Sequence, residues 1–170
     1  MKRLFIIDLK DYTDSMKRFR RPSVRAVIMK NGRIAMVHSL KYDYYKFAGG
    51  GIEEGESHEA ALIREVMEET GLAVKPETIH EFGSVLRIQK SLYEENTIFE
   101  QENFYYFCST DSEILPQNLD EYEKDERFTL EYIEPEKAIE VNRTHEHFGY
   151  DRALIEREAM VLEELIKQNN

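Results

Sequence analysis

The chain has 170 residues, of which 41% are hydrophobic and 34% are charged, and its formal net charge is −11. This length and apolar content predict a single folded domain over residues 1–170 and exclude a disordered chain. The negative charge argues against binding to nucleic-acid polymers or anionic membranes. The single cysteine, Cys108, excludes an internal disulfide. Since no apolar run approaches the roughly 20 residues of a membrane span, we expect a cytoplasmic protein.

The N-terminal part of the chain predicts short strands. Arg3 to Asp8, within residues 1–10, is the first of them, and a stretch rich in lysine and arginine follows it. Ser23 to Met29 and Arg33 to His38 are two further strands, joined by the turn Asn31-Gly32. Asn-Gly between apolar runs is the strongest short signal of a β-hairpin.

The rest of the chain alternates helices with strands. A helix is predicted from Ser57, a good N-terminal cap, to Thr70, and Gly71 ends it. The acid-rich segment Asp111 to Arg127 reads as a solvated excursion. The remaining predicted elements are strands at Glu81 to Ile88, Glu102 to Cys108 and Phe128 to Ile133, and helices at Glu134 to Val141 and about residues 151–167. This order favours a mixed β-sheet covered by helices.

Three carboxylates share one face of the predicted helix 57–70. Glu65, Glu68 and Glu69 are spaced i, i+3 and i+4, and Ala60, Ile63 and Met67 are expected roughly opposite, toward the core. Like charges on adjacent turns repel, so a divalent cation would explain the cluster; carboxylate oxygens suit Mg²⁺ or Mn²⁺. A solvated helix face is the alternative for these glutamates taken alone.

The spacing around this helix resembles the signature of the Nudix hydrolases, the MutT-like family. That signature is Gly, five residues, Glu, seven residues, Arg-Glu, an aliphatic residue, any residue, Glu-Glu, any residue, Gly and an aliphatic residue. The segment 50–72 fills every specified position, with Gly50, Glu56, Arg64, Glu65, Val66, Glu68, Glu69, Gly71 and Leu72. Ala48 stands where many members carry proline. The resemblance implies an α/β/α sandwich with the mixed sheet between helices.

The resemblance also implies a reaction, and it implies roles for the residues of segment 50–72, which we call the box. The reaction is metal-dependent hydrolysis of a diphosphate linkage in a nucleoside diphosphate derivative. Glu65 and Glu69 would be the main ligands of Mg²⁺ or Mn²⁺, and the Gly50 carbonyl would contact the metal. Glu68 would be a further ligand or would activate the attacking water. Arg64 would hold Glu56 as a supporting carboxylate.

The substrate is expected to be a small nucleotide. Residues 87–90 are Arg-Ile-Gln-Lys, so neither the proline of ADP-ribose-type members nor the tyrosine of dinucleoside polyphosphate types is present. This favours a nucleoside triphosphate or a modified nucleotide. Arg25 is a candidate for phosphate contact, and Tyr45 and Phe47 for stacking on a base; ion pairing and core packing are the alternatives. Members often use one more carboxylate from outside the box, for which Glu100, Glu102 and Glu131 are candidates.

Two other functions fit parts of the same pattern. One is a nucleotide-binding sensor without catalysis, although a pure binder need not keep the whole carboxylate set. The other is an isoprenyl diphosphate isomerase, which needs a catalytic cysteine in the pocket. Cys108 lies in an apolar strand and reads as a buried small side chain. The segment 111–127 and the C-terminal helix suit either a pocket wall or a homodimer interface.

Overall fold

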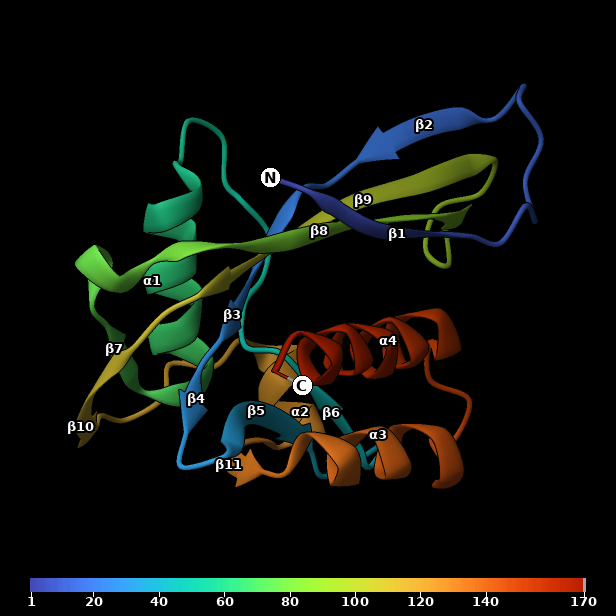
Figure 1. Ribbon diagram of the computed structural model, residues 1–170. Coiled ribbons are helices and arrows are strands. Elements are labelled where there is room, and N and C mark those ends of the chain that lie inside the picture. Colours follow the sequence, from blue (N-terminus) through green and yellow to red (C-terminus); the bar gives the residue numbers. More distant parts are fainter. Residues whose placement is uncertain (170) are drawn as a thin grey trace.

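The computed structural model describes residues 1–169 and has helices on both sides of its strands (Figure 1). Helix α1 (His58–Thr70) lies on one side. Helices α3 (Pro135–Thr144) and α4 (Arg152–Asn169) lie together on the other. The α/β/α sandwich expected from the sequence is therefore confirmed. No helix of the described residues has the length and apolar character to cross a membrane.

The strands form three sheets with mixed pairing. In the largest sheet β8 and β9 are antiparallel, and β1, β2 and β3 join them in parallel. Its strands are β1 (Arg3–Asp8), β2 (Lys17–Arg20), β3 (Ser23–Val27), β8 (His80–Lys90) and β9 (Thr97–Phe107). The other strands are β4 (Met29–Lys30), β5 (Arg33–Ser39), β6 (Tyr44–Lys46) and β11 (Phe128–Ile133) in one sheet, and β7 (Leu72–Val74) and β10 (Thr110–Ile114) in the last.

Side chains of the central strand β3 alternate between two apolar cores, because successive residues of a strand point to opposite faces. Val24 and Ala26 pack in the core that contains Leu62 of α1. Val27 packs in the core that contains Leu162 of α4. Strand β3 is thus buried on both faces and holds the two helical layers apart.

Most predicted elements are confirmed, and their ends follow local signals. Lys30 pairs with Arg33 across the Asn31-Gly32 turn, whose residues both have positive φ, as a type I′ hairpin requires. Strands β8 and β9 are longer than predicted. Strands β2, β6 and β7 and the short 3₁₀ helix Pro76–Thr78 were not predicted.

The ends of α1 are as predicted, but its buried face is not. The Ser57 hydroxyl accepts a hydrogen bond from the Ala60 amide (3.1 Å), and Gly71 has φ +73. Ala60 is exposed and Met67 is only half-buried, so the expected core face is wrong for these residues. The buried residues are Ala61, Leu62, Val66, Glu69 and Thr70. The helix packs on β3 with a face rotated from the expected one, and this brings Glu69 inside.

The segment 111–127 is largely exposed, as predicted, but it is more than a loop. It contains most of β10 and helix α2 (Glu121–Glu126), and it covers the C-terminal end of α1. The amides of Leu115 and Asn118 donate to the carbonyls of Gly71 (2.8 Å) and Glu68 (2.9 Å). The Gln117 amide group donates to the Glu69 carbonyl. These bonds satisfy the carbonyl groups that any helix leaves unpaired at its C-terminal end.

Candidate active site

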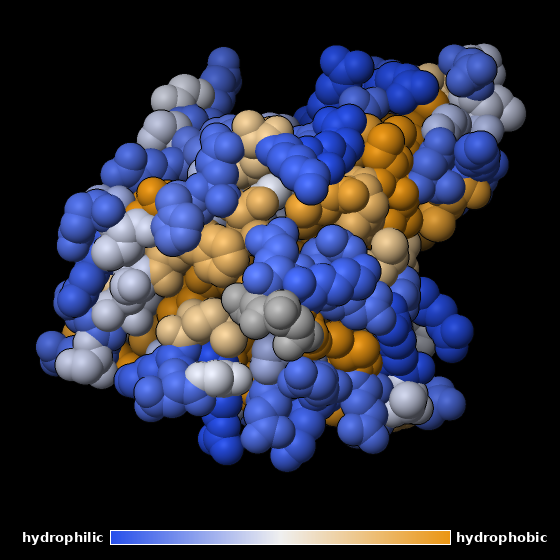
Figure 2. Space-filling view, viewed as in Figure 1, coloured by the Kyte–Doolittle hydropathy of each residue, from blue (hydrophilic) through white to orange (hydrophobic). Residues whose placement is uncertain are grey.

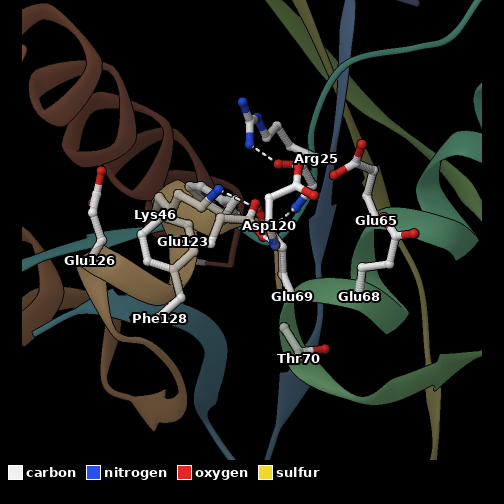
Figure 3. A network of polar contacts seen from close by, with 12 residues as sticks. Arg25, Lys46, Glu65, Glu68, Glu69, Thr70, Asp120, Glu123, Glu126 and Phe128 are labelled. Carbon is white, nitrogen blue, oxygen red and sulfur yellow. Dashed lines mark hydrogen bonds and ion pairs between the residues drawn. The ribbon is translucent and has the colours of Figure 1, made fainter. Parts of the chain in front are cut away.

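The glycine loop and α1 form one wall of a cleft of about 1110 Å³. The floor comes from β3, β8 and β9, and the opposite wall from β6, α2 and the start of α4. Of the candidates from the sequence, the cleft brings together Gly50, Arg64, Glu65, Glu68 and Arg25. Figure 3 shows Glu65 and Glu68 projecting from α1 opposite Asp120, Glu123 and Glu126.

Arg64 organises the carboxylates of the box. Its guanidinium group donates to both oxygens of Glu56 (2.9 and 2.8 Å), to Glu65 (2.7 Å), to Glu68 (3.3 Å) and to the Gly51 carbonyl (3.1 Å). A guanidinium has five N–H groups, so every donor is used. The bidentate bond holds the pKa of Glu56 below its usual value, and bonding to Glu56 raises the pKa of Arg64. The expected support of Glu56 by Arg64 is present in the structure.

Glu65 and Glu68 face the cleft, one turn apart. The side chain of Glu65 is 14% exposed and that of Glu68 is 35% exposed. A Cβ atom at Gly50 would overlap the Glu65 carboxylate, so only glycine lets that carboxylate lie against the loop. The Gly50 carbonyl accepts a hydrogen bond from the Val24 amide (3.0 Å).

Glu69 points away from these two carboxylates and into the protein. It forms a buried ion pair with Lys46 of β6, and its second oxygen accepts a hydrogen bond from the Gly49 amide (2.9 Å). Burial raises the pKa of Glu69 to about 7, although the positive charges of Lys46 and Arg25 oppose this. In this arrangement Glu69 serves as the counter-ion of Lys46, and both of its oxygens are engaged (Figure 3).

The donor set still suits a hard divalent cation. Mg²⁺ typically binds through one or two carboxylates and keeps its other positions for water and substrate phosphates. Glu65 and Glu68 provide two such carboxylates at the open cleft. Within residues 1–169, no group of three or more acidic, histidine or cysteine side chains is arranged around one ion position. The site therefore fits an ion whose coordination is completed by substrate and water oxygens, and not an ion that is bound by protein ligands alone.

The structure separates the three residues that the sequence suggested for substrate contact. Arg25 lies at the floor of the cleft and donates to the Gly49 carbonyl. Phe47 is fully buried and packs edge-on against Tyr105, so it is a core residue. Tyr45 is also buried; its ring stacks on His38 outside the cleft. Tyr45 of β6 and Phe47 just after it alternate with Tyr44 and Lys46, which line the cleft, so both rings lie outside it; this corrects their assignment as base-stacking residues.

The candidates for a carboxylate outside the box do not line the cleft. Glu100 pairs with Arg18 (2.8 Å) and Arg20, Glu102 with Arg3 (2.5 Å), and Glu131 with His38 (2.8 Å). Glu100 and Glu102 lie on β9 but alternate with the residues that face the cleft, which explains why that prediction is wrong.

Carboxylates that were not predicted come from α2 and from the residue that caps its N-terminus. Asp120, Glu123 and Glu126 line the cleft. Glu126 accepts hydrogen bonds from Ser39 and Tyr44 (both 2.9 Å). Asp120 and Glu123 form a capping box, and this spacing of Asp and Glu is a signal that could have predicted the helix.

Two further polar residues were missed at the floor of the cleft. Arg87 and Gln89 lie on β8 and are buried although they line the cleft. They alternate with Leu86 and Ile88, and this alternation of polar and apolar residues could have predicted that Arg87 and Gln89 share one face of the strand. Cys108 is buried outside the cleft, and burial raises its pKa to about 12.

Comparison with known proteins shows the family of the chain. A family model for the NUDIX domain matches residues 19–152. The chain belongs to the NUDIX family. The matched range includes β3 to α3 and therefore the floor and most of both walls of the cleft.

Solved NUDIX structures share the fold. A MutT protein from Bacillus halodurans has a TM-score of 0.55 at 20% identity, over 80% of each chain. A MutT NUDIX hydrolase from Burkholderia pseudomallei has a TM-score of 0.54 at 19% identity, over 81% of this chain and 97% of its own. At such low identity these likenesses bear on the fold alone.

One curated relative is more similar over a short stretch. An RNA pyrophosphohydrolase from Baumannia cicadellinicola is 41% identical over 56 residues. The match covers 32% of this chain and 35% of the length of that relative. It spans too little of either protein to assign an activity.

Proposed function

We propose that the protein is a pyrophosphohydrolase that uses Mg²⁺ or Mn²⁺ to cleave a diphosphate linkage in a small nucleotide. The observation that carries this proposal is the bonding of Arg64. All five of its donors hold the loop carbonyl and the carboxylates of Glu56, Glu65 and Glu68 at the wall of the cleft. Two of these carboxylates, Glu65 and Glu68, lie on α1 at the open cleft, where they suit a divalent ion.

In this proposal Glu65 would hold the metal, and Glu68 would act as the base beside it. A divalent ion there supplies neutralisation of the diphosphate charge and a bound water of lowered pKa. Glu68 is the more exposed carboxylate and has one long bond to Arg64 (3.3 Å), so it is free to accept the proton of the attacking water. Arg64 keeps Glu65 and Glu56 in fixed orientations, and Arg25 offers positive charge at the floor for a substrate oxygen.

A nucleotide-binding sensor without catalysis is the second candidate, and one observation favours it. The ion pair between Lys46 and Glu69 engages a carboxylate that the family signature assigns to the metal. With Glu69 committed, a site that binds nucleotides without turning them over stays compatible with the cleft.

The substrate class rests on the size of the cleft and on charge. A volume of about 1110 Å³ accommodates a small molecule of nucleotide size. The similarity to an RNA pyrophosphohydrolase makes an RNA 5′-triphosphate end a second substrate to test. The net charge of −11 disfavours a polyanion, so we expect the small nucleotide to be preferred. A small-molecule partner and a cytoplasmic location stay predictions.

A substrate panel tests the proposal. Phosphate and pyrophosphate release would be measured for nucleoside triphosphates, modified nucleotides, nucleoside diphosphate derivatives and 5′-triphosphate RNA, with Mg²⁺, with Mn²⁺ and with EDTA. We expect metal-dependent release from at least one small nucleotide and none with EDTA. Binding of nucleotides without turnover of any of them would favour the sensor. Equal turnover in EDTA would contradict the assigned role of the carboxylates.

A further inference from the structure

Side chains on one face of the large sheet form a platform at the floor of the cleft. Strand register places Phe19 beside Phe99, and Phe99 beside Gln89, in a row across β2, β9 and β8. Two residues further along, Gln101 pairs with Arg87 in a second row on the same face. All five side chains line the cleft. We call them the platform.

The second row is held by α4 and the turn before it. Asp151 accepts a hydrogen bond from Arg87 (2.6 Å), and Arg157 donates to Gln101 (3.1 Å). The first row has no comparable bond to α4 among the residues that the structure describes. Phe19 is 46% exposed, which is high for a phenylalanine inside a cleft. The first row is therefore the open part of the platform.

The platform contains polar atoms that the fold leaves without partners. Gln89 is 3% exposed, and its Oε1 atom has no hydrogen-bond partner in the described chain. The Nε atom of Arg87 is in the same situation. A buried polar group without a partner destabilises a protein, so native structures rarely keep one without a reason. A ligand that borders Gln89 would supply that reason.

The aromatic and polar groups of the platform together suit a flat, polar-edged ring. The rings of Phe19 and Phe99 lie 6.2 Å apart at a tilt of 34°, and the Arg87 guanidinium lies over Phe99 at 5.2 Å. Aromatic and guanidinium planes stack on a nucleobase, and the amide of glutamine can both donate to and accept from its edge.

We infer that the platform binds the nucleobase of the substrate, with Gln89 reading the edge of the base and Phe19 and Phe99 stacking on its face. The inference rests on the proposed function, because it takes the substrate to be a nucleotide. It adds a position for the end of the substrate that does not react.

Exposed apolar side chains extend the platform at its outer edge. Leu92 and Tyr93, in the loop between β8 and β9, line the cleft and are strongly exposed. These two side chains give a base a partly apolar surround, as ligand pockets usually have. Figure 2 shows further apolar residues on the arm of the large sheet, on the side toward α4.

Binding to metal-free protein tests the inference apart from catalysis. Affinities would be measured by titration calorimetry and ligand-observed NMR in EDTA, for the four common ribonucleoside 5′-monophosphates and for ribose 5-phosphate. We expect at least one nucleotide to bind about tenfold or more tightly than ribose 5-phosphate, the gain that base stacking provides. Phe19→Ala and Gln89→Leu should each bring the ratio of the nucleotide affinity to the ribose 5-phosphate affinity close to one. Ile114→Ala, which truncates an exposed apolar side chain outside the cleft, should leave it unchanged.

Several results would overturn the inference. Equal binding of ribose 5-phosphate and every nucleotide would assign the cleft to phosphate alone, and no binding of any nucleotide at millimolar concentration would remove the site. A ratio that survives in both Phe19→Ala and Gln89→Leu would place the base elsewhere. In each case, metal-dependent hydrolysis in the substrate panel would still support the proposed function.

Thermal unfolding gives a second readout for Gln89. If this residue is kept for a ligand, Gln89→Leu raises the melting temperature of the free protein, because it removes a buried amide oxygen that lacks a partner. A lowered melting temperature would mean that Gln89 has a structural role and would count against the inference.

Discussion

The ammonium group of Lys46 and the carboxylate of Glu69 form a buried ion pair that joins β6 to the helix of the NUDIX signature. Lys46 also lies over the ring of Phe128 at 4.7 Å. Removing one partner of a buried ion pair leaves a desolvated charge, which costs far more than the pair itself contributes.

Lys46→Met should therefore destabilise the protein by about 3–5 kcal/mol at pH 8. This loss of unfolding free energy, relative to the native protein, should be smaller at pH 6. Burial raises the pKa of Glu69 to about 7 while Lys46 lowers it, so removing Lys46 raises this pKa further. The folded variant therefore takes up a proton at a higher pH than the native protein does, and it regains stability relative to the native protein as the pH falls. Urea unfolding at both pH values measures this. The double variant Lys46→Met with Glu69→Gln, which carries no unpaired charge, should recover much of the loss; a double variant no more stable than Lys46→Met would contradict the pairing.

Glu68→Gln should lower turnover about 10²–10⁴-fold, the usual effect of losing a general base. Folding should be nearly unchanged, because Glu68 is partly exposed and bonds weakly to Arg64. Phosphate release on the best substrate and the melting temperature provide the two measurements. Glu59→Gln, an exposed position on the same helix, is the matched control and should retain full activity. Equal rates in both variants would refute the role of Glu68.

Arg64→Lys tests whether geometry or charge matters at the centre of the site. A lysine keeps the positive charge, but it cannot bond both oxygens of Glu56 and the carboxylates of Glu65 and Glu68 at once. We expect kcat to fall at least about tenfold, or about 1.4 kcal/mol in barrier. Steady-state kinetics checks this, and wild-type kcat would show that charge alone suffices.

Gly71→Ala should destabilise the protein more than Gly55→Ala. Both glycines have φ between +73 and +79, so an alanine at either position pays a similar backbone strain of about 1–3 kcal/mol. At Gly71 the new Cβ would also overlap the Leu115 carbonyl oxygen, whereas nothing lies within 4 Å at Gly55. The difference between the unfolding free energies of the two variants, measured in urea, gives the contribution of the overlap with Leu115. Equal losses would mean that segment 115–118 moves away from α1 without cost.

Cys108 should resist alkylation while the protein is folded. Burial raises its pKa from 9.0 to about 12, so very little of the reactive thiolate is present at pH 8. Iodoacetamide labelling should be slow in buffer and fast in concentrated urea. Rapid labelling of the folded protein would reopen the isomerase hypothesis, which needs a reactive cysteine.

Local signals account for the parts of the fold and site that could be predicted from the sequence. Ser57 and Gly71 set the ends of α1, and Asn31-Gly32 sets a hairpin, through bonds that span only a few residues. The spacing of Glu56, Arg64, Glu65 and Glu68 predicts a shared face and an arginine partner, and the structure has both.

Long-range packing determines the parts that could not be predicted. The pattern of Ala60, Ile63 and Met67 suggested a core face that left Glu69 outside, and nothing near Lys46 in the sequence indicates a carboxylate partner 23 residues away. Tyr45 and Phe47 were aromatic candidates whose side depends on how β6 pairs with β5. Arg87 and Gln89 needed the register of β8 and β9 to become visible as neighbours of Phe99.

The hydrogen bonds from Leu115, Gln117 and Asn118 to the C-terminal end of α1 have a consequence for synthesis on the ribosome. The acidic helix is complete in the nascent chain at Thr70, but its last carbonyls acquire their donors more than 40 residues later. A chain that has emerged only as far as β9 therefore carries the helix with a frayed end. Ribosome-stalled chains of increasing length should show protease protection of residues 66–71 only after the segment that contains Asn118 leaves the exit tunnel.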